Sequence, residues 1–291
     1  MIRAADLLRP DTPILFDGGM GTGLMHRGLE SGEAPELWNI ERPGEVLDLH
    51  KEFVEAGSQV IETNTFGANP IRLRMTGTDV STKDVIAAAC GLAHAAADGR
   101  ALVAGSVGPL GELVEPLGTL SLDEAREAYA EAIEHLMRYD VDVILIETMM
   151  SVDEAQIALR QALIAGASVV AVTMNFDATP KGPRTAFGES PADAMKRLQD
   201  AGAHIVGSNC GAGFDTMSRV ARECVNAATH PVLIQANAGI PVVGANGLRY
   251  PESPESFAAF SKELSEIGVR LIGGCCGTGP EHIRQVRKQL V

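Results

Sequence analysis

The sequence predicts a single (β/α)8 barrel that takes up residues 1–291. Short runs rich in Val, Ile and Leu recur eight times along the chain, separated by longer stretches with helical periodicity. Most of the runs lack a regular polar alternation, which is typical of parallel strands covered on both faces. No shift in composition, linker or low-complexity stretch divides the chain. Eight uninterrupted strand–helix units favour a closed barrel over a doubly wound sheet.

The expected strands lie at residues 14–16, 59–62, 102–104, 141–146, 168–174, 204–207, 232–235 and 270–272. The stretches between them are amphipathic. In residues 121–139 apolar side chains recur near a period of 3.6, and Ser121 and Glu124 form a capping-box pattern at the start. A glycine that ends a helix just before a strand recurs at Gly57, Gly166, Gly202 and Gly268.

Composition and charge limit the classes of partner. Hydrophobic residues make up 45% of the chain and charged residues 21%, as in a globular protein with a sizeable core. A net charge of −14 disfavours nucleic acids and anionic membranes as partners. The N-terminus has no secretory apolar stretch and no run could span a bilayer, so we expect a cytoplasmic protein. Its five cysteines are then expected to be thiols or metal ligands.

Polar and sulfur-containing residues follow the expected strands at the points where the hydrophobic runs stop. A (β/α)8 barrel gathers the carboxyl ends of its strands on one face, where active sites lie. The residues placed there are Asp17, Gly18, Gly19, Glu62, Thr63, Asn64, Ser106, Glu147, Thr148, Asn175, Asn209, Cys210, Asn237, Cys275 and Cys276. We therefore expect the active site at this face.

Three of the cysteines, Cys210, Cys275 and Cys276, follow expected strands. Neighbours in a strand point to opposite faces, so the adjacent pair can share a metal only where the backbone leaves strand geometry. Glycines on both sides of the pair allow this. The pattern predicts three zinc ligands, with small core residues or a strained vicinal disulfide as alternatives. Cys90 and Cys224 fall in helical stretches and are expected to be buried structural thiols.

A zinc ion with three thiolate ligands and an open fourth position has a restricted chemistry. The site is electron-rich and therefore poor at activating water. It can instead hold a substrate thiol deprotonated near neutral pH while the sulfur stays nucleophilic. The predicted reaction is alkylation of a thiol.

Six segments carry a family resemblance. They lie at residues 16–22, 62–66, 144–148, 208–211, 237–241 and 273–278, and they include Asp-Gly-Gly-Met-Gly-Thr, Glu-Thr-Asn-Thr-Phe and Gly-Gly-Cys-Cys-Gly-Thr. Together they resemble the homocysteine S-methyltransferase family over nearly the whole chain. The first two segments are most similar to the homocysteine-binding module of cobalamin-dependent methionine synthase.

The resemblance implies zinc-dependent methyl transfer to the thiol of homocysteine, giving methionine. It assigns zinc ligation to Cys210, Cys275 and Cys276. It also implies that Asp17 and Glu147 hold the ammonium group of homocysteine and orient it for the reaction. A structural salt bridge or a helix cap is the alternative role for these two carboxylates.

Other strand-end residues complete the expected substrate site. Gly18 and Gly19 would bring backbone N–H groups to the substrate carboxylate, or would be ordinary turn glycines. Ser106 is expected to contact substrate. Asn237 would take the fourth zinc position in the absence of homocysteine, or make an ordinary loop hydrogen bond.

The methyl donor stays open. The resemblance implies that betaine-using members of the family carry aromatic residues at positions corresponding to the vicinity of Gly67 and to Thr148. Such aromatic faces can cage a cationic methyl donor. Neither position is aromatic here, and a packing role is favoured for the single tryptophan, Trp38. Betaine is therefore disfavoured. The remaining donors are methylcobalamin on a separate corrinoid protein and a small donor such as S-methylmethionine, unless the chain is a module of a larger system.

Two rival functions are compatible with the same pattern. One is a barrel lyase or aldolase that uses Glu147 as a base and keeps the cysteines as structural residues. Its Schiff-base form lacks an obvious nucleophile, since Lys181 lies in a loop beyond the fifth strand. The other is a non-catalytic protein that binds zinc or thiols and senses homocysteine. Bound zinc argues against the first rival, and methionine formation against the second.

Overall fold

A computed structural model describes residues 2–211, 213–244 and 247–290. Its centre is a sheet of parallel strands in the order β1-β10-β7-β6-β5-β4-β3-β2, and a bridge between Phe16 and Val60 joins the two edges. The strands are β1 (Ile14–Leu15), β2 (Val60–Glu62), β3 (Leu102–Val107), β4 (Val143–Met149), β5 (Val170–Met174), β6 (Ile205–Cys210), β7 (Val232–Ala236) and β10 (Leu271–Gly274). This arrangement confirms the predicted barrel.

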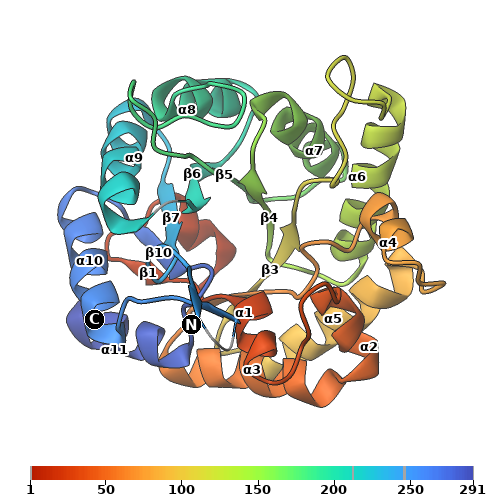
Figure 1. Cartoon of the computed structure of the whole chain (residues 1–291), viewed down its shortest axis with the longest axis horizontal. Helices are drawn as coiled ribbons and strands as arrows, with labels where there is room; N and C mark the ends of the chain where they lie inside the picture. Colours follow the sequence, from red (N-terminus) through yellow and green to blue (C-terminus); the bar gives the residue numbers. More distant parts are fainter. Residues whose placement is uncertain (1, 212, 245–246, 291) are drawn as a thin grey trace.

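Helices form an outer ring around the strands (Figure 1). They are α1 (Met20–Met25), α2 (Trp38–Glu41), α3 (Pro43–Ala56), α4 (Pro70–Met75), α5 (Thr82–Ala97), α6 (Leu122–Arg138), α7 (Val152–Ile164), α8 (Pro191–Asp200), α9 (Gly213–Ala227), α10 (Pro254–Glu266) and α11 (Pro280–Leu290), with the 3-10 helices η1 (Ala4–Leu8) and η2 (Pro35–Leu37). Within the described ranges, no helix combines the length and the apolar character needed to cross a membrane.

Local sequence chemistry sets the ends of these elements as predicted. The Ser121 hydroxyl accepts the Glu124 N–H, and the Glu124 carboxylate accepts the Ser121 N–H, so the capping box at the start of α6 is confirmed. Gly57 ends α3 in a left-handed conformation with φ at 113°. That backbone geometry, which glycine adopts without a steric cost, turns the chain from the helix into β2.

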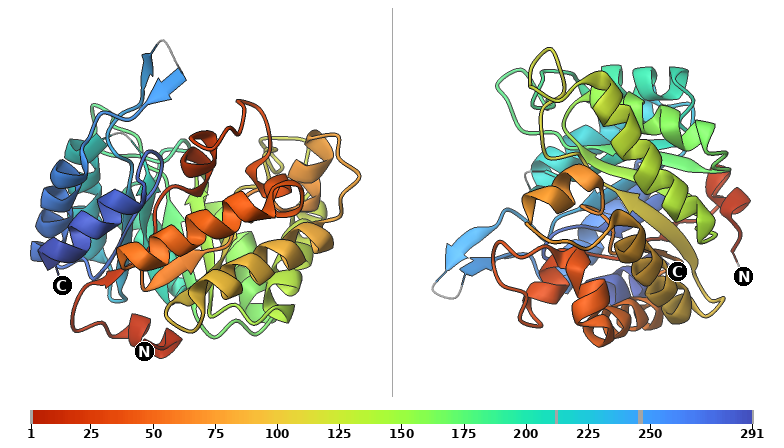
Figure 2. Two further views of the ribbon diagram at one scale, coloured as in Figure 1. Left: turned by 90° about the horizontal axis from the view of Figure 1, so that it is seen from below. Right: turned by 90° about the vertical axis from the view of Figure 1, so that its right-hand side faces the viewer.

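Two apolar layers hold the barrel together. The larger lies between the sheet and the helices, and the smaller fills the barrel interior with side chains such as Phe16, Val60 and Leu145. Leu7 of η1 is fully buried against the interior layer, at the end of the barrel opposite the carboxyl ends of the strands (Figure 2). The interior of the barrel is thus a packed core, and it is filled by side chains as in other (β/α)8 barrels.

One feature was not predicted, a two-stranded hairpin formed by β8 (Val242–Gly244) and β9 (Gly247–Arg249). It projects from the body of the molecule after β7 (Figure 2). Val243 is 88% exposed, so the hairpin contributes little to the core. Its short strands lack the periodic pattern by which the barrel strands were identified.

The close spacing of β6 and β7 gives a stability prediction. A Cβ atom added at Gly207 would lie 1.8 Å from the backbone carbonyl oxygen of Leu233. Because backbone on the neighbouring strand cannot move aside cheaply, Gly207→Ala should cost about 3 kcal/mol in the free energy of unfolding, the upper end of the usual cost of overpacking. Gly91→Ala is the matched control, since Gly91 lies in α5 with open space around it. That control should be neutral or stabilise by about 0.5–1 kcal/mol. Urea denaturation of both variants measures the difference.

Candidate active site

A cavity of about 280 Å³ lies at the carboxyl ends of the barrel strands. Its walls come from segments far apart in the sequence and include Gly18, Glu62, Glu147, Cys210 and Cys275. Sulfur and carboxylate groups therefore face one enclosed volume. The prediction that the polar strand ends meet at one face is confirmed.

The three predicted zinc-ligand cysteines meet at one wall of this cavity. The sulfur atoms of Cys210, Cys275 and Cys276 all lie within 4.8 Å of one another. Cys210 is the last residue of β6 and has a left-handed φ of 62°, which an L-residue adopts only at a cost. β10 ends at Gly274, so the adjacent cysteines leave strand geometry as their shared orientation requires.

The electrostatics of the sulfur cluster fit a divalent cation. Hydrogen bonds from the Cys275 and Cys276 thiols lower the pKa of Cys210 to about 2. The same hydrogen bonds, shared with Cys210, raise the pKa of Cys275 well above its usual range and that of Cys276 to about 11. The thiol of Cys210 thus ionises readily. The thiols of Cys275 and Cys276 resist ionisation because they donate hydrogen bonds to the Cys210 sulfur and because a second negative charge would lie next to it. A bound cation would remove that resistance, and three clustered sulfurs suit zinc.

The loops after β1 and β10 lock together beside the sulfurs. Gly277 N–H donates to the Thr22 hydroxyl at 3.0 Å, and the Thr278 hydroxyl donates to the Cys275 carbonyl at 2.6 Å. Gly19 N–H donates to the Thr278 carbonyl at 3.0 Å. A Cβ atom at Gly19 would lie 2.5 Å from the Cys275 carbonyl oxygen. The close approach of these loops therefore explains Gly19, and its amide, predicted to bind substrate, already has an acceptor.

Glu147 is a buried carboxylate at the end of β4 that faces the cavity. The hydroxyl of Ser106 donates to its Oε1 at 2.5 Å, and the amide of Asn209 donates to its Oε2 at 3.1 Å. Burial raises the pKa of Glu147, while hydrogen bonds with Ser106, Glu62 and Thr148 oppose the rise. The two predicted residues Ser106 and Glu147 are thus brought together, and Ser106 fixes the orientation of the carboxylate.

Asp17 and Glu62 add two more carboxylates next to Glu147. Asp17 is 1% exposed, and its Oδ2 accepts the Glu62 N–H at 3.0 Å, while its other oxygen has no hydrogen-bond partner among the described residues. Glu62 lines the cavity itself, and the Gln235 side-chain amide donates to it at 2.5 Å. Burial raises the pKa of both carboxyls, and the charge of Glu147 raises them further.

Sequence reasoning placed Glu62 at a strand end but did not include it in the site. Its carboxylate nevertheless lines the cavity from the end of β2, whereas Asp17, which accepts the Glu62 N–H, is not among the lining residues. The signal was present, because a carboxylate at the end of a buried barrel strand is costly unless it has a role. The sequence does not show in which direction the Glu62 and Asp17 side chains point, and that direction decides which of them lines the cavity.

Asn209 was also left out of the predicted site, although it joins the carboxylates to the sulfurs. Its Nδ2 donates to Glu147 and lies 3.8 Å from the Cys275 sulfur. Its Oδ1 accepts the Thr148 N–H at 2.7 Å and the Thr173 hydroxyl at 2.8 Å. These contacts fix the amide, so the carboxylate and sulfur groups hold a constant separation.

Asn237 links two of the cysteine loops. Its Oδ1 accepts the Cys276 N–H at 3.0 Å, while its Nδ2 donates to the Gly211 carbonyl and lies 3.5 Å from the Cys210 sulfur. The oxygen that would bind a metal is therefore engaged by a backbone amide in this structure. The fourth-ligand role predicted for Asn237 would require that hydrogen bond to break, and it stays a prediction.

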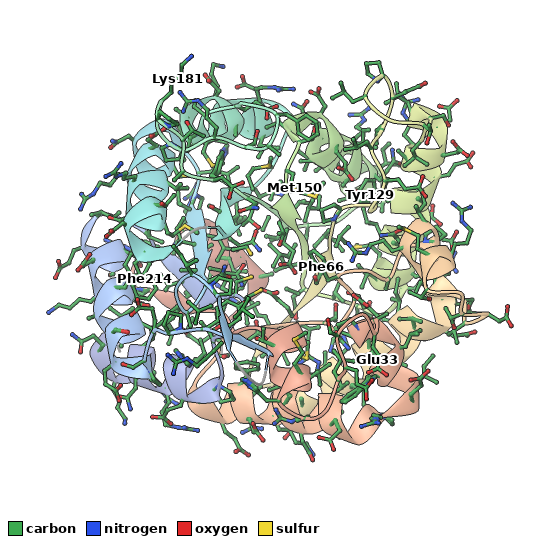
Figure 3. All side chains as sticks on the ribbon, in the orientation of Figure 1. Glu33, Phe66, Tyr129, Met150, Lys181 and Phe214 are labelled. Atoms are coloured by element: carbon green, nitrogen blue, oxygen red, sulfur yellow. The ribbon has the colours of Figure 1, made fainter. Side chains whose placement is uncertain are left out.

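Several other residues considered in the sequence analysis lie outside the cavity. Cys90 and Cys224 are fully buried in helices, as expected for structural thiols, and burial raises the pKa of Cys90 to about 12. Trp38 is 2% exposed and packs under the guanidinium of Arg42, in agreement with a packing role. Lys181 lies at the outer edge of the molecule (Figure 3). The described residues that line the cavity include no lysine, which disfavours a Schiff-base lyase.

The crowding of carboxyls around Glu62 predicts a pH-dependent stability effect. Its pKa is raised in the folded protein, so the stabilisation it provides is complete below its ordinary pKa and is lost as the pH rises through the folded value. Glu62→Gln should therefore raise the melting temperature by a few degrees at pH 8 and leave it unchanged near pH 4. The exposed substitution Glu263→Gln should change neither value. Equal shifts at both pH values would contradict the assigned cause.

Comparison with known proteins gives consistent matches over this fold. Residues 14–290 match the model of a family described as homocysteine S-methyltransferase. A methionine synthase of Mycobacterium tuberculosis is 33% identical over 93% of the chain, which spans 24% of that relative. Betaine--homocysteine S-methyltransferase 1 of Rattus norvegicus is 33% identical over 95% of the chain and 72% of its own length. The metallated homocysteine methyltransferase MmuM of Escherichia coli shares the fold, with a TM-score of 0.80, 21% identity and coverage of 96% and 97%.

Proposed function

The chain belongs to the homocysteine S-methyltransferase family, and we propose that it transfers a methyl group to the thiol of homocysteine to give methionine. The observation that carries this proposal is the convergence of Cys210, Cys275 and Cys276 beside buried carboxylates in one cavity. A metal site that could bind a thiol and acidic groups that could bind an ammonium group, both in one cavity, match the two ends of an aminothiol substrate.

Cys210, Cys275 and Cys276 would hold a zinc ion. When bound, this ion lowers the pKa of a substrate thiol while leaving the sulfur nucleophilic. The chain's own contribution is to preorganise the three sulfurs. The side-chain amides of Asn209 and Asn237 contact the sulfurs of Cys275 and Cys210, respectively. The left-handed backbone at Cys210 directs its side chain toward the adjacent pair of cysteines.

Glu147 and Glu62, which line the cavity, would bind the ammonium group of homocysteine, and Asp17 would add a third acidic group next to Glu62. Three clustered carboxyls with raised pKa values are unfavourable without a cation, and an ammonium group supplies one. The unpartnered Oδ1 of Asp17 supports this assignment, since buried acceptors in proteins are rarely left unsatisfied. Ser106 and Gln235 would orient the acidic groups without contacting the reacting atoms.

Fixing both ends of homocysteine would set the direction of its sulfur. In the transfer, the sulfur forms a bond to the methyl carbon while the bond from that carbon to the donor breaks. The three atoms must be nearly collinear, so a substrate held at two points reacts faster than one free to rotate. Glu147 and Glu62 would thus act by orienting homocysteine, and Asp17 would act through its hydrogen bond with Glu62.

The methyl donor of this reaction has two candidates. The chain spans about a quarter of the length of the methionine synthases that it matches. Methylcobalamin on a separate corrinoid protein and a small donor such as S-methylmethionine are the two candidates. Betaine is disfavoured because Gly67 and Thr148 offer no aromatic face.

The test is methionine formation by zinc-loaded protein supplied with homocysteine and one donor at a time. The panel contains S-methylmethionine, S-adenosylmethionine, betaine, methylfolate, and methylcobalamin with and without a corrinoid protein. We expect methionine with at least one donor and none after zinc is removed by a chelator. Tight homocysteine binding with no product from any donor would indicate a sensor. A protein that binds neither zinc nor homocysteine would favour the lyase.

A further inference from the structure

One basic side chain reaches the cavity from the side of α4. Among the described residues that line the cavity, Arg72 is the sole arginine or lysine, and it shares that lining with Glu62, Glu147 and the three cysteines. The family assignment and the proposed homocysteine site give Arg72 no role. A positive charge in this position calls for an explanation of its own.

The fold makes room for Arg72 and fixes its direction. A Cβ atom at Gly111 would lie 3.1 Å from the Arg72 Cγ, and one at Gly67 would lie 3.1 Å from its Nε. The guanidinium carbon sits 5.4 Å from the centre of the Phe66 ring, near the middle of the molecule (Figure 3). The absence of a Cβ atom at Gly67 and Gly111 therefore leaves space for the Arg72 side chain, and the Phe66 ring packs near its guanidinium.

The guanidinium has no acceptor in the described part of the protein. No hydrogen bond or ion pair within 4.0 Å involves its side chain there. Glu36 is the neighbouring carboxylate, but its Oε1 accepts the Gly67 N–H at 2.6 Å instead. A partly buried guanidinium offers up to five N–H donors, and leaving them unpaired is costly. The geometry therefore leaves a place for an anion from outside the chain.

We propose that Arg72 binds the carboxylate of the methyl donor, and hence that the donor is a small carboxylate-bearing molecule. A planar guanidinium pairs with a carboxylate through two parallel hydrogen bonds, which fixes the orientation as well as the affinity. The acidic cluster of Asp17, Glu62 and Glu147 is assigned to the homocysteine ammonium. Arg72 serves the second substrate in the same cavity.

This division of the cavity matches the charges of a methyl sulfonium donor. Such a donor carries a cationic methyl-bearing centre, which the acidic groups and the sulfurs attract. Its carboxylate would be repelled by those groups and drawn to Arg72. The donor would then lie with its methyl group toward the sulfurs. The inference rests on the proposed function for the identity of the reaction, but its binding test is independent of turnover.

The test is calorimetric titration of zinc-loaded protein with S-methylmethionine and with its carboxamide, which lacks the negative charge. Wild-type protein should bind the acid about 10- to 100-fold more tightly than the amide, the usual strength of hydrogen bonds between charged groups. Arg72→Gln should remove that preference, and Arg72→Lys should restore part of it. Arg74→Gln, an exposed position on the same helix, is the matched control and should keep the full preference.

Homocysteine kinetics supply the second readout. Arg72→Gln should raise KM for the carboxylate donor and leave KM for homocysteine within about two-fold, which a merely structural role would not produce. Equal affinity of wild-type protein for acid and amide, or no binding of the acid, would overturn the inference. A rise in KM for homocysteine alone would mean that Arg72 binds homocysteine and not the methyl donor, and would also overturn the inference. Methionine formed from methylcobalamin but from no carboxylate donor would leave the proposed function intact and overturn the inference.

Discussion

Replacing Cys276 with alanine should abolish both zinc retention and methionine formation. The three sulfurs lie within 4.8 Å of one another, and removal of one leaves two ligands, fewer than catalytic zinc sites use. Substitutions of groups that merely support metal ligands cost about 10- to 100-fold in affinity or activity, so loss of a ligand should exceed about 100-fold. Elemental analysis of the purified variant and its rate with the active donor measure the two effects.

Cys90→Ala is the control for this experiment. Cys90 is a fully buried thiol in α5, outside the sulfur cluster, so the variant should keep full zinc occupancy and rate despite a small loss of stability. Circular dichroism of Cys276→Ala separates loss of metal from loss of fold. Full zinc occupancy and a normal rate in a folded Cys276→Ala protein would contradict the ligand assignment.

The second large effect is expected from Glu147→Gln. The variant keeps the size of the side chain but removes the charge that would pair with the homocysteine ammonium. Breaking one partner of a buried charge pair costs roughly 2–5 kcal/mol, so kcat/KM for homocysteine should fall by about 30-fold or more. Steady-state kinetics with homocysteine varied at saturating donor measure it.

A substrate without the amino group shows whether the loss arises from that contact. With 4-mercaptobutanoate, wild-type protein should be slowed by a similar factor, and Glu147→Gln should add little further loss, because the contact is already absent. The exposed substitution Glu263→Gln should leave both substrates unaffected. If Glu147→Gln lowered kcat/KM by the same factor with 4-mercaptobutanoate as with homocysteine, Glu147 would act elsewhere than at the ammonium group.

Much of this molecule could be read from local patterns. The barrel strands were all located, since buried parallel strands are short apolar runs that need no distant information to recognise. The cysteines were identified because Cys275 and Cys276 are adjacent among glycines, which few structural roles require. The hairpin after β7 escaped prediction because its residues bury little and therefore show no hydrophobic period.

Sequence alone thus determined the architecture, the sulfur cluster and the face of the barrel on which that cluster lies, since strand ends in a barrel converge whatever the loops do. Tertiary structure decided which side chains at that face reach the cavity. Glu62 lines it while Asp17 does not, and Asn209 joins carboxylate to sulfur. Arg72 enters from a helix rather than a strand end. Such choices depend on side-chain directions and on contacts between distant segments, and a linear pattern does not encode either.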